Sequence, residues 1–265
     1  MQTLELETMR CELDGPLARL RFNRPEALNA ANWTWVHNLI TAMNHLAQSS
    51  ETHVLIISGE GRAFCSGLDT KELAQGHLTL EWFETWERGI IALANLNVIS
   101  IAAIHGYCLG GGLQVALACD LRLASTDAIL SIPAVKEGVV AALGPMRLAR
   151  LIGAAAAKQL CLLGHRFTAE EGFALRIINE VVPPGSLEER ALALAQELLA
   201  IPFTALLHTK HQIDAAFDQD PEALMTELIA AQADCLRSPE HIAVMEEYRQ
   251  MQARRARERS KEASG

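Results

Sequence analysis

Apolar runs of strand length alternate with longer polar–apolar stretches along most of the chain. At the start, strand-like runs flank the turn signal Asp14-Gly15 and predict a hairpin. Short apolar runs bounded by glycine or polar residues predict buried strands at His53–Ser58, Val98–Ile104, Leu121–Ala124, Ile129–Ile132 and Ile177–Val182. Helical spacing of apolar residues predicts helices at Trp33–Leu46, Thr79–Leu96 and Leu187–Leu199. This alternation favours an α/β fold built from successive layers.

The last quarter of the chain is predicted to contain helices and no strands. Pro202 marks a boundary, so we expect one body over residues 1–200 and a helical region with a charged tail over residues 201–265. The apolar helical residues of the C-terminal third would leave large exposed patches on a monomer. We therefore expect a homotrimer or a dimer of trimers.

Composition narrows the possible partners. The chain has 265 residues, 50% of them hydrophobic, and a net charge of −9. The hydrophobic fraction is typical of a globular protein. The negative net charge disfavours binding to nucleic acid or to an anionic membrane. We see neither an N-terminal signal nor a run of membrane-spanning length, so no membrane insertion is expected. The six cysteines are scattered, without a CxxC pair or zinc spacing, which predicts no metal site and reduced thiols in the cytoplasm.

Two glycine-containing segments each follow an apolar strand and lead into a helix. They are Phe64–Lys71, with Gly67, and His105–Gln114, with the triple glycine Gly110-Gly111-Gly112. Glycine lets a backbone approach a ligand, and a helix start leaves N–H groups unpaired. Two such N–H groups aimed at one point form an oxyanion hole. Glycine for packing alone is the alternative. The phosphate-loop, GxGxxG and GxSxG patterns are absent.

The order of motifs resembles the crotonase (enoyl-CoA hydratase/isomerase) superfamily. The loop Asn23–Ala30, which contains Ala27, is similar to the family's CoA-binding loop. The family's two oxyanion segments resemble AFCSGLDTKEL and HGYCLGGGLQVALACDLRLAS, and PAVKEG, RLARLIG and the stretch Leu163–Pro183 continue the match in order. The resemblance covers about nine-tenths of the chain. It implies a crotonase-like ββα spiral followed by a helical trimerisation region.

The resemblance also implies roles for individual residues. The N–H groups of Leu68 and Gly111 would hold the oxygen of an acyl-CoA thioester, which is the substrate, and no cofactor is permanently bound. Ser66, Leu68 and Asp69 would line the path of the adenine and pantetheine groups. Arg24 and Lys71 would lie near the CoA phosphates, as basic side chains suit phosphate; a solvated surface charge is the alternative for both.

Two positions depart from the hydratase pattern. Family hydratases use two glutamates as acid and base, and here those positions hold Gln114 and Ala134. The two positions that carry acidic catalysts in several family isomerases, Ala134 again and Ala142, also lack an acid. Gln114 can still bind a water or a substrate through hydrogen bonds. We therefore expect inefficient hydration, because an added water needs both proton carriers.

Other groups remain as candidates for the missing proton chemistry. Glu137 is the nearby carboxylate, with a surface residue as its alternative reading, and His105 is a second candidate base or a core histidine. Glu87 and Arg88 lie on the helix expected to roof the acyl pocket, so they are candidates for substrate contact.

Three features are shared with one branch of the superfamily. GGGxQ, PAxKEG and the LxQG segment Leu73–Gly76 resemble the 3,5-dihydroxyphenylacetyl-CoA dioxygenases, although this chain lacks their long N-terminal region. The hypothesis is an enzyme of lipid metabolism, an isomerase or lyase, that stabilises a thioester enolate. The alternatives are a cofactor-independent arylacetyl-CoA oxygenase and a non-catalytic acyl-CoA-binding homologue.

Overall fold

The computed structural model describes residues 1–262, and the chain divides into two compact units, Met1–Leu199 and Ala200–Gly265. Two sheets lie in the first unit, one ordered β1-β2-β3-β4-β6-β8-β11 and the other β10-β9-β7-β5. The strands are β1 Gln2–Leu6, β2 Met9–Asp14, β3 Leu17–Phe22, β4 Val54–Gly59, β5 Ala63–Cys65, β6 Ile99–Ile104, β7 Tyr107–Leu109, β8 Leu121–Ser125, β9 Ile129–Ser131, β10 Phe167–Thr168 and β11 Glu180–Val182.

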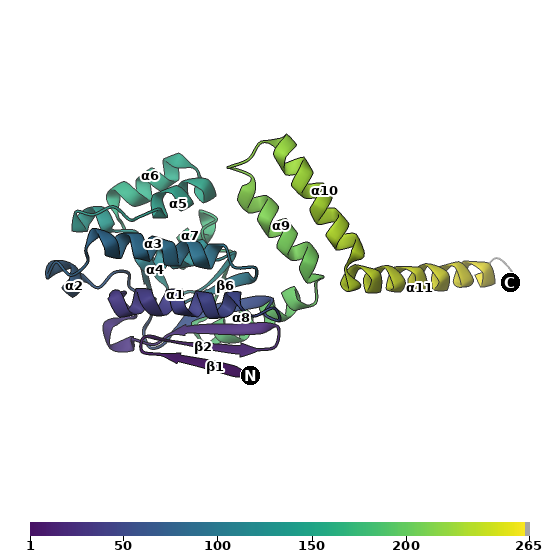
Figure 1. Cartoon of the computed structure of the whole chain (residues 1–265), viewed down its shortest axis with the longest axis horizontal. Coiled ribbons are helices and arrows are strands. Elements are labelled where there is room, and N and C mark those ends of the chain that lie inside the picture. Colours follow the sequence, from purple (N-terminus) through teal and green to yellow (C-terminus); the bar gives the residue numbers. More distant parts are fainter. Residues whose placement is uncertain (263–265) are drawn as a thin grey trace. The chain divides into compact units, whose positions relative to one another are not determined.

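From β4 to β9, consecutive strands alternate between the two sheets, and a helix follows each pair. β4, β6 and β8 lie parallel in the large sheet, whereas β5, β7 and β9 lie parallel in the small one. The repeating unit is therefore strand, strand, helix, which confirms the predicted α/β class and ββα arrangement (Figure 1). The predicted hairpin is also present, because β2 and β3 pair antiparallel across Asp14-Gly15.

The helices of the first unit include three that lie close to the positions predicted from apolar spacing. The helices of this unit are α1 Trp33–Ala47, α2 Thr70–Ala74, α3 Leu80–Ala94, α4 Gly111–Ala118, α5 Gly144–Ile152, α6 Ala154–Leu163, α7 Ala169–Ala174 and α8 Leu187–Leu199, with 3-10 turns at Pro25–Ala27, Ala134–Glu137 and Pro184–Ser186. Asn32 caps α1 by accepting a hydrogen bond from Trp35 N, and Thr168 and Glu171 form a capping box on α7.

The central strands of the large sheet, β4, β6 and β8, are covered on both faces, and alternate residues of each strand point to opposite faces. Val54 and Ile56 of β4 belong to a cluster that includes Leu187 and Ala191 of α8. Leu55 and Ile57 belong to the main core, with α1 and α3. Continuous apolar strands are typical of such a doubly covered parallel sheet, and this sheet supports the loops that form the pocket described below.

The second unit is helical, with α9 Phe203–Ala215, α10 Pro221–Arg237 and α11 Pro239–Glu262. The end of the predicted charged tail, residues 263–265, lies outside the described residues. The exposed apolar side chains of the second unit include Ile213, Met225, Ile229, Leu236 and Ile242. Within residues 1–262 no single helix is long and apolar enough to cross a membrane, and one bent pair, Pro184–Leu199 with Phe203–Ala215, passes that test on length and composition only.

Candidate active site

The first glycine segment leaves β5 in a conformation that exposes one backbone N–H. Gly67 has φ +98°, which favours glycine. Its carbonyl accepts a hydrogen bond from Ala31 N at 2.7 Å, and Asp69 N donates to Ala31 O at 2.9 Å. This pairing holds the segment on both sides of Leu68. The Leu68 N–H itself donates no hydrogen bond to any of residues 1–262.

The second glycine segment connects β7 to the start of α4. Gly110 has φ +51° and donates its N–H to Ser131 O at 2.8 Å. A Cβ on Gly112 would lie 2.0 Å from the carbonyl oxygen of Cys65, so only glycine allows α4 to pack this closely against β5. Gly111 is the first residue of α4, and its N–H makes no hydrogen bond within the part of the chain described.

The two segments touch each other at their glycines. A Cβ on Gly67 would lie 3.2 Å from Gly111 N, and a Cβ on Gly111 would lie 3.4 Å from Gly67 Cα. Leu68 and Gly111 both line one pocket. Two unpaired N–H groups, one of them at the positive end of a helix, can stabilise an anionic oxygen in that pocket.

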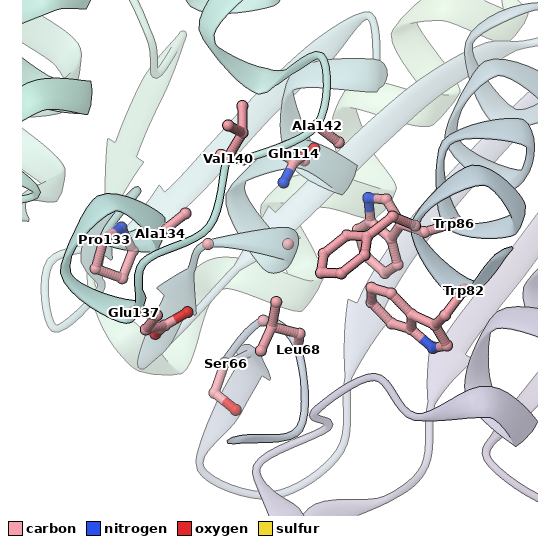
Figure 2. A pocket seen from close by; sticks show the side chains of 15 residues that line it. Ser66, Leu68, Trp82, Trp86, Gln114, Pro133, Ala134, Glu137, Val140 and Ala142 are labelled. Carbon is pink, nitrogen blue, oxygen red and sulfur yellow. The ribbon is translucent and has the colours of Figure 1, made fainter. Parts of the chain in front are cut away.

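The pocket has an empty volume of about 470 Å³, counting its open mouth. Figure 2 shows Trp82 and Trp86 along one side, Ala134 and Glu137 on the opposite side, and Gln114 between them. The remaining lining residues are Ser66, Gly67, Leu68, Phe83, Gly110, Gly111, Pro133, Val140, Ala141 and Ala142.

The aromatic side of the pocket belongs to a stack of indoles that reaches into the core. Trp82 and Trp86, one helical turn apart on α3, have ring centroids 5.5 Å apart, and Trp86 stacks on Trp35 of α1 at 5.4 Å. All three are buried. Trp86 also fixes the width of the pocket beside the second segment, because a Cβ on Gly111 would lie 2.9 Å from its ring.

Gln114 brings a neutral amide into this apolar surrounding. The side chain is buried, and its Oε1 accepts no hydrogen bond from residues 1–262. Gly144 at the start of α5 packs against it, since a Cβ there would lie 2.9 Å from Gln114 Cγ. A buried acceptor without a donor is costly unless a water or ligand supplies one. Gln114 therefore has hydrogen-bonding capacity available to whatever enters the pocket.

Glu137 is the carboxylate that lines the pocket. It lies at the end of the 3-10 turn Ala134–Glu137 and forms no ion pair or hydrogen bond with the described residues. Partial burial raises the pKa of Glu137 above its ordinary value, because desolvation disfavours the charged form. A carboxylate with a raised pKa is a stronger base once deprotonated.

The other predicted CoA-binding residues lie around the first segment. Arg24 Nη1 donates to Asp69 Oδ2 at 2.7 Å, and Asp69 caps α2 by accepting from Lys71 N at 3.0 Å. Burial acts to raise the pKa of Asp69, but the hydrogen bonds from Arg24 and Lys71 N outweigh it, and the net shift is downward. The Asp69 carboxylate thus holds the start of α2 and neutralises part of the charge of Arg24.

The predicted binding residues differ in whether they reach the pocket. Ser66 and Leu68 line it, whereas Arg24, Ala27, Asp69 and Lys71 do not. Ala27 ends the 3-10 turn Pro25–Ala27, and Lys71 is an exposed residue of α2. The CoA-binding roles of these four residues stay predictions.

Three candidates for proton transfer or substrate contact lie outside the pocket. His105 points its Nε2 to Gly61 O at 3.1 Å. Arg88 pairs with Glu84 on the exposed face of α3. Glu87 accepts a hydrogen bond from Leu143 N at 3.2 Å and pairs with Arg147. None of the three lines the pocket, so Glu137 remains the candidate base.

Sequence reasoning missed the residues that shape the acyl side of the pocket. These are Trp82, Phe83, Trp86, Val140 and Ala141. Two tryptophans four residues apart on a predicted roof helix were the available signal, because such residues share one helix face. None of the chain's cysteines lines the pocket, and burial raises the pKa of the Cys65 thiol to about 12. Within residues 1–262 no cluster of three or more His, Cys, Asp or Glu could hold a metal.

Comparison with known proteins adds an independent view of the chain. A family model described as enoyl-CoA hydratase/isomerase matches residues 12–256. The chain is 36% identical over 225 residues to enoyl-CoA hydratase domain-containing protein 2, mitochondrial, of Bos taurus, covering 81% of this chain and 76% of the relative. It is 29% identical over 237 residues to the short-chain-enoyl-CoA hydratase of Clostridium acetobutylicum, covering 88% and 90%.

The fold of this chain is similar to that of a solved structure from Thermobifida fusca, which is a complex with CoA. It superposes with a TM-score of 0.78 at 28% identity and covers 86% of this chain and 93% of its own. The predicted crotonase-like spiral is thereby confirmed. The match concerns one chain, so the trimerisation region stays a prediction.

Proposed function

Because the chain belongs to the enoyl-CoA hydratase/isomerase family and is an acyl-CoA-processing enzyme of that family, we propose that it stabilises a thioester enolate between Leu68 N and Gly111 N. The observation that carries this proposal is the pair of unpaired N–H groups that line one pocket. A negative oxygen accepts both hydrogen bonds more strongly than a neutral carbonyl does, so the enolate is favoured.

The proposed substrate is a CoA thioester, and the enzyme needs no permanent cofactor. The solved structure from Thermobifida fusca that resembles this fold is a complex with CoA. Ser66, which lines the pocket beside Leu68, fits a role along the pantetheine arm (Figure 2). The acyl group then extends between the indoles and the alanines.

The reaction that we propose is isomerisation of a β,γ-enoyl-CoA to the α,β-enoyl-CoA. Glu137 removes the α-proton, and the electron pair moves onto the thioester oxygen held by the two N–H groups. The carbonyl re-forms as the electron pair moves through the carbon chain and the γ-carbon takes the proton back from Glu137. One proton leaves and one returns, so the step needs no co-reactant.

Efficient hydration fits the site less well, although several relatives are named hydratases. Hydration needs an acid and a base around one water. The two pocket positions that the family pattern gives to those groups hold Gln114 and Ala134, and neither transfers protons at neutral pH. Gln114 can only orient a water or an acyl substituent through its amide.

We expect the protein to isomerise a β,γ-enoyl-CoA with a rate that depends on ionised Glu137. A base acts in its deprotonated form, so log(kcat/KM) should rise about one unit per pH unit below the pKa of Glu137 and level off above it. Because burial raises that pKa, the limb should lie above the pH range of an ordinary glutamate. The assay follows the absorbance of the conjugated product from acidic to neutral pH.

The control is Glu137→Gln, which keeps the size of the side chain and removes the base. It should flatten the acid limb and lower the plateau. An unchanged pH profile in this variant contradicts the role of Glu137. Oxygen uptake with an arylacetyl-CoA, measured on the same preparation, would favour the cofactor-independent oxygenase. Inactivity in isomerisation, hydration and oxygen uptake, with binding retained, would favour the non-catalytic homologue.

We also propose that the protein assembles as a trimer or a dimer of trimers. The second unit exposes apolar residues on each of its helices, including Ile213, Ile229 and Ile242, and exposed apolar surface of this kind is typical of interfaces. Sedimentation velocity at micromolar concentration should give a mass of three or six chains of 28.9 kDa. A stable monomer contradicts the proposal. The cytoplasmic location stays a prediction.

A further inference from the structure

Glu87 joins the helix that carries the indoles to the turn that faces them. Its Oε2 accepts a hydrogen bond from Leu143 N at 3.2 Å, and its Oε1 pairs with Arg147 of α5. The two side chains are only 14% and 12% exposed. We call Glu87, Arg147 and the Leu143 N–H the Glu87 clamp. The pair with Arg147 is partly buried, whereas the hydrogen bond from Leu143 N lies at an exposed position. Hydrogen bonds to an ionised carboxylate are stronger than those between neutral groups.

The clamp acts on a turn of the pocket wall that is also held by two backbone hydrogen bonds, from Ala142 N to Val140 O at 2.9 Å and from Gly144 N to Ala141 O at 2.8 Å. Ala141 and Ala142 line the pocket directly before Leu143. Ala142 has φ +40°, a left-handed conformation that alanine rarely adopts. Such a conformation persists only where surrounding contacts hold it. The hydrogen bond to Leu143 N is such a contact, adjacent to the strained residue.

The indole side of the pocket is attached to the Glu87 side chain through α3. Trp86 precedes Glu87 directly, and Trp82 lies one turn earlier. The clamp therefore ties the helix that carries the indoles to the turn that contains Ala142, which Figure 2 shows on the same side of the pocket as Trp86. Helix α5 begins at Gly144, directly after Leu143, and Gly144 packs against Gln114.

We propose that Glu87 is a positioning residue that sets the distance between the α3 indoles and the Ala141–Leu143 turn, and so determines how tightly the acyl group is held. This inference rests on the proposed acyl-CoA function. Glu87 does not line the pocket, so its effect passes through the turn. The acceptor for Leu143 N–H is the functional part, and the charge of the pair with Arg147 is not required.

Two double variants separate the acceptor from the charge. Glu87→Gln with Arg147→Met keeps an oxygen for Leu143 N–H and removes both charges. Glu87→Met with Arg147→Met removes the oxygen as well, with a side chain of similar length. Neither leaves an uncompensated buried charge, and replacing a buried ion pair with neutral groups is often tolerated by the fold. Arg88→Ala is the matched control, because it breaks the exposed pair with Glu84 on the same helix.

The measurement is isothermal titration of each protein with acetoacetyl-CoA and with CoA. The ratio of the two dissociation constants gives the contribution of the acyl group, which a change in global stability alone does not alter in folded protein. We expect the parent, Arg88→Ala and the glutamine variant to agree within about twofold. In the methionine variant, the preference for acetoacetyl-CoA over CoA should fall about tenfold. This change corresponds to about 1.4 kcal/mol and to the loss of one hydrogen bond.

The possible outcomes separate this inference from the proposed function. A methionine variant whose ratio equals that of the parent overturns the positioning role while leaving acyl-CoA binding intact. A tenfold loss in both variants overturns the claim that the acceptor, and not the charge, is required. A parent protein that binds neither ligand overturns the proposed function and this inference with it.

Discussion

Replacing Gly111 with proline is expected to lower kcat for isomerisation by about 10²- to 10³-fold, the usual effect of losing one oxyanion donor. Proline has no N–H, so only Leu68 N would remain to hold the thioester oxygen. The substitution is compatible with the helix, because Gly111 is the first residue of α4 and proline is favoured at that position. Single-turnover kinetics on folded protein measure the loss.

The matched control for this variant is Gly111→Ala. Both substitutions add a Cβ that would lie 2.9 Å from the ring of Trp86, but alanine keeps the N–H. The difference between the two variants therefore isolates the hydrogen bond from the steric change. Circular dichroism and thermal melting establish that both fold. If the proline variant turns over substrate as fast as the alanine variant, Gly111 N is not an oxyanion donor.

Installing both missing glutamates should raise the hydration of crotonyl-CoA by about 10²- to 10⁴-fold, the range of general acid–base catalysis. Gln114→Glu is nearly isosteric, and Ala134→Glu adds its side chain on the pocket side opposite the indoles (Figure 2). Together they provide an acid and a base around one water. The loss of the enoyl absorbance follows the reaction.

Each single variant serves as a control for the double variant. One carboxylate supplies only one of the two proton transfers, so each single substitution should recover less than the pair. A parent protein that already hydrates crotonyl-CoA at about 10 s⁻¹, the median turnover of enzymes, contradicts our interpretation of Gln114 and Ala134. In that case another group, with Glu137 the nearest candidate, must carry the protons.

The local elements could be predicted because each depends on nearby residues. The apolar run His53–Ser58 predicted β4 at Val54–Gly59, and the helix at Trp33–Leu46 was found at Trp33–Ala47. The small sheet was harder to predict. Its strands β5 and β7 have three residues each, too few for an alternating pattern to stand out. These strands form through pairing across the chain.

The sequence by itself determined where the two glycine segments lie and that Gln114 and Ala134 occupy the positions of the two family glutamates, because glycine and proton-carrying side chains are visible as residue types. Only the tertiary structure decided which side chains meet. Arg24 pairs with Asp69, 45 residues away, and Glu87 reaches Arg147 across 60 residues. Such contacts depend on the rotation of each helix and the packing between elements, and neither is encoded in local spacing. That is why the indole wall and the Glu87 clamp emerged from the fold.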